Sequence, residues 1–86
     1  MIRYSTANDT SVTEAMKIIG ARSEYEGIDA EYKMIERIFN ILKLEWTVLW
    51  QELIKNNNRY YDRLVLQDEN GKVSEIWFEV TEFLRK

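Results

Sequence analysis

The sequence predicts one α+β domain, residues 1–86, in which three helices cover one face of a C-terminal β-hairpin. Over residues 24–40, apolar side chains recur every three or four positions, the pattern of an amphipathic helix. Residues 60–68 and 72–80 are rich in β-branched and aromatic residues and flank a turn sequence, as in a hairpin. Hydrophobic residues make up 45% of the 86 residues, which is enough for one small core.

Residues 1–10 are predicted to be loosely ordered, apart from a candidate strand at their start. Ile2 and Tyr4 alternate with polar residues over residues 1–5, which suits a short strand beside the hairpin. An unpaired tail is the alternative. The following residues are small and polar, so a loop is expected there.

A first, short helix is predicted over residues 12–19. Ser11 and Glu14 fit a capping box, in which a hydroxyl and a carboxylate satisfy each other's backbone donors. One side of this helix would carry the apolar residues Val12, Ala15, Met16 and Ile19. Gly20 follows as a suitable C-cap.

The longest helix is predicted over residues 24–40, with a second capping box formed by Ser23 and Glu26. Its apolar stripe consists of Tyr25, Ile28, Tyr32, Ile35, Ile38, Phe39 and Leu42. Its solvated face consists of Glu24, Glu31, Lys33, Glu36 and Arg37. Gly27 costs about 1 kcal/mol relative to alanine inside a helix, so we expect it to mark a close packing contact or a frayed turn.

A third helix is predicted over residues 44–55. If it continued from the second, a helix of thirty-two residues would span roughly 48 Å. A compact chain of this length has a radius of gyration of about 12 Å, so we expect a break near Asn40, which tolerates the left-handed conformation. The inner face of the third helix would carry Trp46, Leu49, Trp50 and Leu53. Three asparagines, residues 56–58, would end it.

The turn of the hairpin determines its register. Asp68 and Gly71 occupy the first and fourth positions of a type I turn, and the glycine is free to adopt positive φ. Such a turn makes a three-residue loop with a G1 bulge, which places Asp68 opposite Lys72. One face then carries Tyr60, Leu64, Leu66, Ile76, Phe78 and Val80. The other carries Tyr61, Arg63, Val65, Gln67, Glu75, Trp77 and Glu79. A last helical turn is expected to begin at Thr81.

Composition narrows the chemistry open to this chain. Cysteine and histidine are absent, which removes disulfides, thiolate metal sites, the commonest zinc ligand and the commonest general base. No phosphate-binding, dinucleotide-binding, nucleophile-elbow or zinc-protease motif is present. Acidic residues gather at the start of the long helix, where they favour the helix dipole and match no metal-binding spacing: Glu24, Glu26, Asp29 and Glu31. We therefore expect no enzymatic activity, no cofactor and no metal.

The outer face of the hairpin is the predicted contact surface for another protein. In the register above, Arg63 lies opposite Trp77, and an apolar surface rimmed by charge is formed by Tyr61, Val65 and Trp77. Cross-strand pairing and stacking of Arg63 on Trp77 would explain the same residues structurally. The partner is not identified by the sequence. A second copy of the chain is one candidate, because an exposed edge strand needs protection.

Nucleic-acid binding is the alternative function. Lys55, Arg59 and Tyr60 combine two cations with an aromatic ring, as in proteins that bind single strands. The net charge of −3, from 12 basic and 15 acidic residues, argues against binding to nucleic acids or anionic membranes. No apolar run is long enough to span a membrane, and residues 1–5 lack the apolar core of a signal peptide. A cytoplasmic protein is expected.

Overall fold

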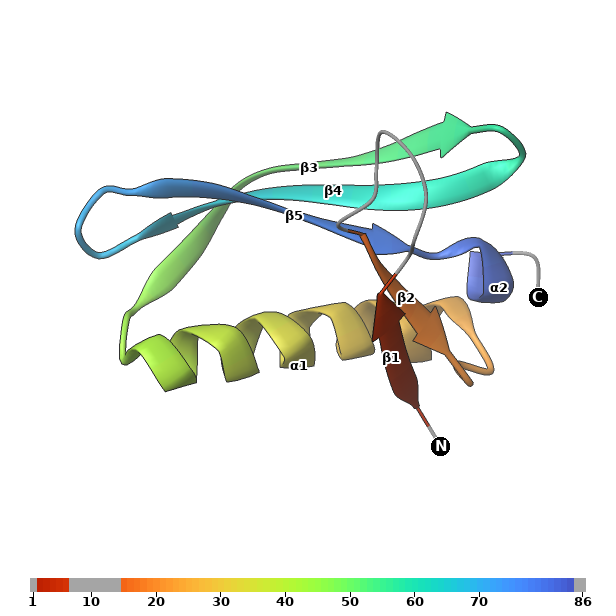
Figure 1. Cartoon of the computed structure of the whole chain (residues 1–86), viewed down its shortest axis with the longest axis horizontal. Helices are drawn as coiled ribbons and strands as arrows, with labels where there is room; N and C mark the ends of the chain where they lie inside the picture. The colour runs from red at the N-terminus through yellow and green to blue at the C-terminus, as the bar shows by residue number, and fades with distance from the viewer. Residues whose placement is uncertain (1, 7–14, 85–86) are drawn as a thin grey trace.

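The computed structural model describes residues 2–6 and 15–84, which form one long helix and a five-stranded mixed sheet. The elements in chain order are β1 (Arg3–Thr6), β2 (Met16–Ile19), α1 (Glu24–Leu42), β3 (Trp46–Asn56), β4 (Arg59–Asp68), β5 (Val73–Glu79) and α2 (Thr81–Leu84). The strand order is β1-β2-β5-β4-β3, and only β2 and β5 run parallel. Helix α1 lies along one face of the sheet (Figure 1). We name this the inner face and the opposite one the outer face.

The predicted long helix is confirmed as α1, with its end two residues further on. The Ser23 hydroxyl accepts a hydrogen bond from the Glu26 backbone N–H at 3.2 Å, as expected of an N-cap. The Glu26 carboxylate accepts from the backbone N–H of Arg22 at 3.1 Å. Lys43, and not Asn40, adopts the left-handed conformation (φ 58°) that ends the helix.

The close packing contact expected at Gly27 is with Phe83. A Cβ atom at Gly27 would lie 2.4 Å from ring atoms of Phe83, which is 1% exposed. Phe83 belongs to α2, which confirms the predicted last helical turn. Glycine at this position therefore lets α2 pack directly on α1.

The core lies between α1 and the inner face of the sheet. Its buried residues are Ile18, Ala21, Ala30, Ile35, Phe39, Leu64, Leu66, Phe78, Val80 and Phe83. Trp46 extends this core, because its ring stacks on Phe39 and Tyr32 at centroid distances of 5.9 and 6.4 Å. Each large apolar side chain buried in this way contributes roughly 1.5–3 kcal/mol.

The C-terminal hairpin is confirmed as β4 and β5, in the predicted register. Leu64 pairs with Ile76 and Arg63 with Trp77. The Asp68 N–H donates to the Lys72 carbonyl at 3.0 Å, and Gly71 adopts a φ of +85°. The inner and outer faces of the hairpin are therefore those expected from the turn alone.

The predicted third helix over residues 44–55 is wrong, because this segment forms β3 and pairs along its length with β4. A β-bulge between Val48 and Trp50 shifts the alternation of the strand by one residue. Apolar residues then occur at both even and odd positions, and this spacing imitates a helical stripe. Asn57 and Asn58 form the two-residue turn to β4, with φ angles of 53° and 65°, as a type I′ hairpin turn requires.

The predicted helix over residues 12–19 is wrong in its described part, because Met16–Ile19 is β2. This strand is held by residues far away in the sequence: Ile18 pairs with Tyr4 of β1, and Met16 pairs with Phe78 of β5. The proposed capping box preceding it lies outside the described residues.

The N-terminal strand that the alternation favoured over a tail is confirmed as β1. The Tyr4 hydroxyl donates to the Ala30 carbonyl of α1 at 2.7 Å, which ties this strand to the helix. The expectation of loose order applies mainly to residues 7–10, which lie outside the described residues.

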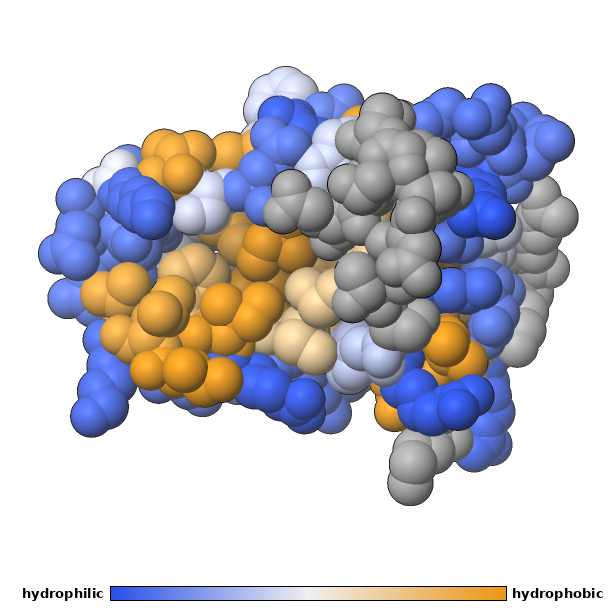
Figure 2. All heavy atoms as spheres, viewed as in Figure 1, coloured by the Kyte–Doolittle hydropathy of each residue, from blue (hydrophilic) through white to orange (hydrophobic). Residues whose placement is uncertain are grey.

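Helix α1 covers the sheet incompletely. Figure 2 shows apolar atoms gathered over the C-terminal half of α1 and the sheet above it. Ile41 and Leu42 at the end of α1 are 75% and 56% exposed, and Val73 at the start of β5 is 54% exposed. No helix in the described part of the chain combines the length and apolar character needed to cross a membrane.

Candidate functional site

The outer face of the sheet is built by alternate residues of β3, β4 and β5. Arg63 lies at its centre, between Glu52 of β3 and Trp77 of β5. The neighbouring row on one side consists of Trp50, Val65 and Glu75, and the row on the other side consists of Ile54, Tyr61 and Glu79. Strand alternation therefore brings two tryptophans and two carboxylates around one guanidinium.

These side chains form a connected network that we name the Arg63 cluster: Trp50, Glu52, Arg63, Glu75 and Trp77. The Arg63 guanidinium contacts the carboxylates of Glu52 and Glu75 at 2.7 and 2.9 Å. The same carboxylates also accept hydrogen bonds from indoles: Glu52 from Trp50 at 3.0 Å, and Glu75 from Trp77. Glu52 on β3 and Glu75 on β5 therefore have equivalent contacts, because each binds both Arg63 and a tryptophan of its own strand.

The cluster is charged and partly open to solvent. The hydrogen bond between Arg63 and Glu75 raises the pKa of Arg63. The pKa of Glu75 is lowered, chiefly by its hydrogen bond to Arg63 and to a smaller extent by that to the Trp77 indole. The side chains of Glu52 and Glu75 nevertheless remain 41% and 45% exposed. Exposed pairs of this kind contribute little to folding, so protein stability alone gives a weak reason for the arrangement.

The predicted contact residues come together, with different exposures. Arg63 and Trp77 are partly exposed, whereas Tyr61 is 2% exposed and packs edge-on against Trp77 at 6.3 Å. Tyr61 therefore lies on the outer face but offers almost no surface for a contact. Trp50, which is 58% exposed, and its neighbour Glu52 were missed because the segment was assigned to a helix. The signal that identifies them is the Asn57–Asn58 turn, which predicts a strand on each side.

The residues of the nucleic-acid alternative do not share a surface. Lys55 and Tyr60 lie opposite each other on the inner-face side of the β3–β4 hairpin, with the Lys55 amine 5.8 Å from the ring centre. Arg59 lies on the outer face, 3.8 Å from the Glu79 carboxylate. The two cations therefore extend from opposite faces of the hairpin.

A second polar site is buried between α1 and the sheet. Glu31 of α1 and Asp62 of β4 are 1% and 7% exposed. The Gln51 amide donates to Asp62 at 3.0 Å, and Tyr32 in turn donates to Gln51 at 2.8 Å. Burial, followed by the hydrogen bond to Asp62, raises the pKa of Glu31 to about 10. A pKa this high keeps Glu31 protonated at neutral pH, beside the Asp62 carboxylate.

The expectation that Glu31 belongs to a solvated helix face is wrong. The buried side of α1 consists of Gly27, Ala30, Glu31, Ile35 and Phe39, whereas Tyr25 of the predicted stripe is 81% exposed. Relative to the orientation that the apolar stripe predicts, α1 is rotated about its axis, because the side of the helix at Gly27 packs on Phe83. The sequence feature that indicates a buried polar neighbour is Asp62, because it is an acidic residue at an inner-face position of the predicted hairpin.

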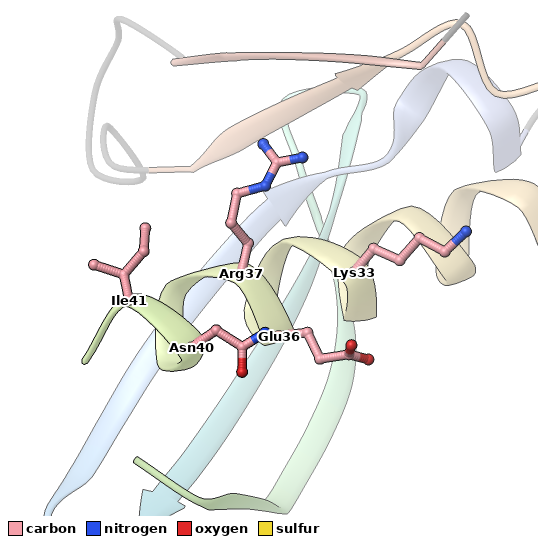
Figure 3. A pocket seen from close by; sticks show the side chains of 5 residues that line it. All are labelled: Lys33, Glu36, Arg37, Asn40 and Ile41. Atoms are coloured by element: carbon pink, nitrogen blue, oxygen red, sulfur yellow. The ribbon is translucent and has the colours of Figure 1, made fainter. Parts of the chain in front are cut away.

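Two hollows border helix α1. One of about 180 Å³ lies beside the carboxyl pair and is lined by Glu24, Ile28, Glu31, Gln51, Leu53, Asp62, Val80, Phe83 and Leu84. The Glu31 oxygens have almost no accessible surface there, and no hydrogen-bond donor of the described residues reaches them. The other, of about 410 Å³, has a wall supplied by α1 alone, with side chains that splay apart along the helix (Figure 3).

In residues 2–6 and 15–84, no three side chains of His, Cys, Asp or Glu gather in a way that could hold a metal ion. The Arg63 cluster combines charged and aromatic groups that are open to solvent. No protein-family model, curated protein or solved structure matches this chain.

Proposed function

We propose that this chain is a non-enzymatic protein that acts by binding another protein through the outer face of its sheet. The observation that carries the proposal is the Arg63 cluster, which displays two tryptophans and an arginine on a face that α1 does not cover. Tryptophan and arginine are enriched among the residues that dominate binding energy at protein interfaces. The indole and guanidinium groups are already oriented by hydrogen bonds, so little side-chain entropy is lost on binding.

The charge of the cluster favours a partner with a basic surface. Glu52 and Glu75 carry two negative charges against the single positive charge of Arg63, and the whole chain has a net charge of −3. Each carboxylate retains acceptor capacity on its exposed side. Lysine and arginine side chains of a partner can donate to them and also pack on the exposed indole of Trp50. Opposite charge also speeds encounter between the two proteins.

The nucleic-acid alternative has no comparable support. The exposed carboxylates of the cluster attract a basic protein, whereas they would repel the phosphates of a nucleic acid. The cations of that alternative lie on two faces, as described above.

Site-specific photo-cross-linking tests the proposal in the cells that produce the protein. A benzophenone side chain replaces Thr47, an exposed residue on the outer face, or Glu36, an exposed residue of α1. We expect a discrete protein adduct from position 47 and none of the same mass from position 36. The adduct should be lost when Trp50→Ser is added. Trp77→Ser should have the same effect.

Two results would contradict the proposal. One is the same set of adducts from both positions, because that indicates collisions without a defined surface. The other is an unchanged yield in Trp50→Ser, because this side chain is the most exposed aromatic of the cluster. Circular dichroism of each variant confirms that a lost adduct reflects lost contact and not lost folding.

A further inference from the structure

Strand β3 is a long sheet edge with apolar side chains. It spans 11 residues, and β4 is its only neighbour in the sheet of the described residues. Leu49, Trp50 and Leu53 along it are 50%, 58% and 55% exposed. Proteins usually shorten, charge or cover such an edge, because its free N–H and C=O groups can pair with another strand.

The hairpin geometry shows which backbone groups face this edge. Asn57 and Asn58 form a two-residue loop closed by the pair Asn56–Arg59, and residue pairs along an antiparallel ladder alternate between hydrogen-bonded and non-hydrogen-bonded. The closing pair of such a loop is a hydrogen-bonded one. The alternation then directs the N–H and C=O groups of Gln51, Leu53 and Lys55 away from β4.

The β-bulge marks out the regular part of the edge. Pairing is irregular between Val48 and Trp50, and it is continuous from Trp50 to Asn56. Leu53 is the midpoint of this seven-residue stretch. The three residues whose backbone groups point away from β4 are therefore distributed symmetrically, with Gln51 and Lys55 two positions on either side of Leu53.

We propose that β3 pairs antiparallel with β3 of a second copy about a twofold axis at Leu53, which joins two sheets into one of ten strands. A twofold axis perpendicular to the sheet keeps the inner faces of both copies on the same side and makes the contact self-complementary. Leu53 then faces Leu53 of the second copy, and Gln51 faces Lys55. All outward-facing backbone groups of the stretch find partners.

Charge favours this register over the one whose axis lies one residue earlier. With the axis at Leu53, Glu52 faces Ile54 and no two like charges lie directly opposite. With the axis one residue earlier, Glu52 would face Glu52, which is destabilising in a sheet. The pairing also brings apolar surface of the second copy towards Leu53 and Ile28, which are 55% and 36% exposed beside the carboxyl pair.

This contact is independent of the proposed function, because it uses the strand edge and leaves the outer face open. The outer faces of both copies would form one continuous surface, with two Arg63 clusters. A heterologous partner could therefore bind a dimer as well as a monomer.

Single cysteines test the register, since the natural chain has none. Directly opposed Cβ atoms in an antiparallel pair lie about 4.5–5.5 Å apart, within reach of a disulfide after small adjustment. We expect oxidised Leu53→Cys to run as a covalent dimer on a non-reducing gel. The matched control is Lys55→Cys, on the same strand and side, whose two copies would lie ~13 Å apart along the strands. Equal cross-linking of the two variants would overturn the proposal.

Light scattering of the unmodified chain provides the second test, and it does not depend on any variant. We expect twice the mass of one chain at millimolar concentration, and the mass of one chain in Leu53→Pro. Proline at this position removes an outward-facing N–H and leaves the β3–β4 ladder intact. A monomeric unmodified chain at this concentration overturns the proposal, as does a Leu53→Pro variant that remains dimeric.

Discussion

Replacement of Glu31 by glutamine is expected to remove a pH-dependent loss of stability. Burial and the hydrogen bond to Asp62 raise the pKa of Glu31 from 4.5 to about 10. Between these two values the native state holds one proton more than the unfolded chain. The free energy of unfolding of the natural protein therefore falls as pH rises through this window, with a slope from this group of about 1.4 kcal/mol per pH unit.

The magnitude at neutral pH follows from the width of the window. From 4.5 to pH 7 the cost of keeping Glu31 protonated accumulates to roughly 3 kcal/mol. This is a large part of the 5–15 kcal/mol or so that stabilises a typical domain. Glu31→Gln preserves the shape of the side chain and a donor towards Asp62, and it has no proton to lose. The variant should be more stable at pH 7 by about this amount, and the difference should disappear near pH 4.

Urea denaturation at a series of pH values from 4 to 9 measures this difference. Subtracting the variant from the natural protein cancels the contributions of the other carboxylates. The matched control is Glu36→Gln, on the exposed side of the same helix, for which no such pH-dependent gain is expected. A constant difference between the two proteins from pH 4 to pH 9 would show that folding does not raise the pKa of Glu31, and it would contradict our account of the buried pair.

Substitutions at three further positions test how the fold is held together. Gly27→Ala should destabilise the protein by about 1–3 kcal/mol, because the new methyl group would overlap the buried Phe83 ring; an unchanged melting temperature would contradict the α1–α2 contact. Ser23→Ala should cost about 1 kcal/mol in urea denaturation through loss of the N-cap of α1, whereas Ser23→Asp should cost almost nothing. Trp50→Ser should change the free energy of unfolding by no more than about 0.5 kcal/mol, because the side chain is largely exposed; a large loss would assign Trp50 to the core.

Local chemistry made α1 and the β4–β5 hairpin predictable. The apolar stripe from Tyr25 to Leu42 specifies a helix from local spacing alone, and Asp68 with Gly71 specifies both a turn and a register. The outer face of the hairpin followed directly from that register. Arg63 and Trp77 could therefore be placed side by side before their contacts were known.

The strands that were predicted as helices, β2 and β3, depend on strand pairing that a short segment of sequence does not reveal. Strand β2 is held between β1 and a parallel β5, more than fifty residues away in the sequence. In β3, the bulge before Trp50 disguised a strand as a helical stripe. Two of the five residues of the Arg63 cluster, Trp50 and Glu52, were missed for this reason.

The buried carboxyl pair could not be predicted because it depends on the rotation of α1 about its own axis. That rotation is determined by the packing of Phe83 on Gly27, and these two residues are separated by most of the sequence. It buries Glu31 and exposes Tyr25, the reverse of what the apolar stripe indicates.

The most direct test of the central claim uses the three tryptophan indole N–H signals in a nitrogen–proton NMR spectrum. Trp50 and Trp77 belong to the outer face, whereas Trp46 stacks on Phe39 and Tyr32 on the inner side and serves as an internal control. On titration with the protein captured by cross-linking, we expect the signals of Trp50 and Trp77 to shift and that of Trp46 to remain in place. A shift of Trp46 alone, with Trp50 and Trp77 unchanged, would show that the partner binds elsewhere and would contradict the assignment of the outer face as the contact surface.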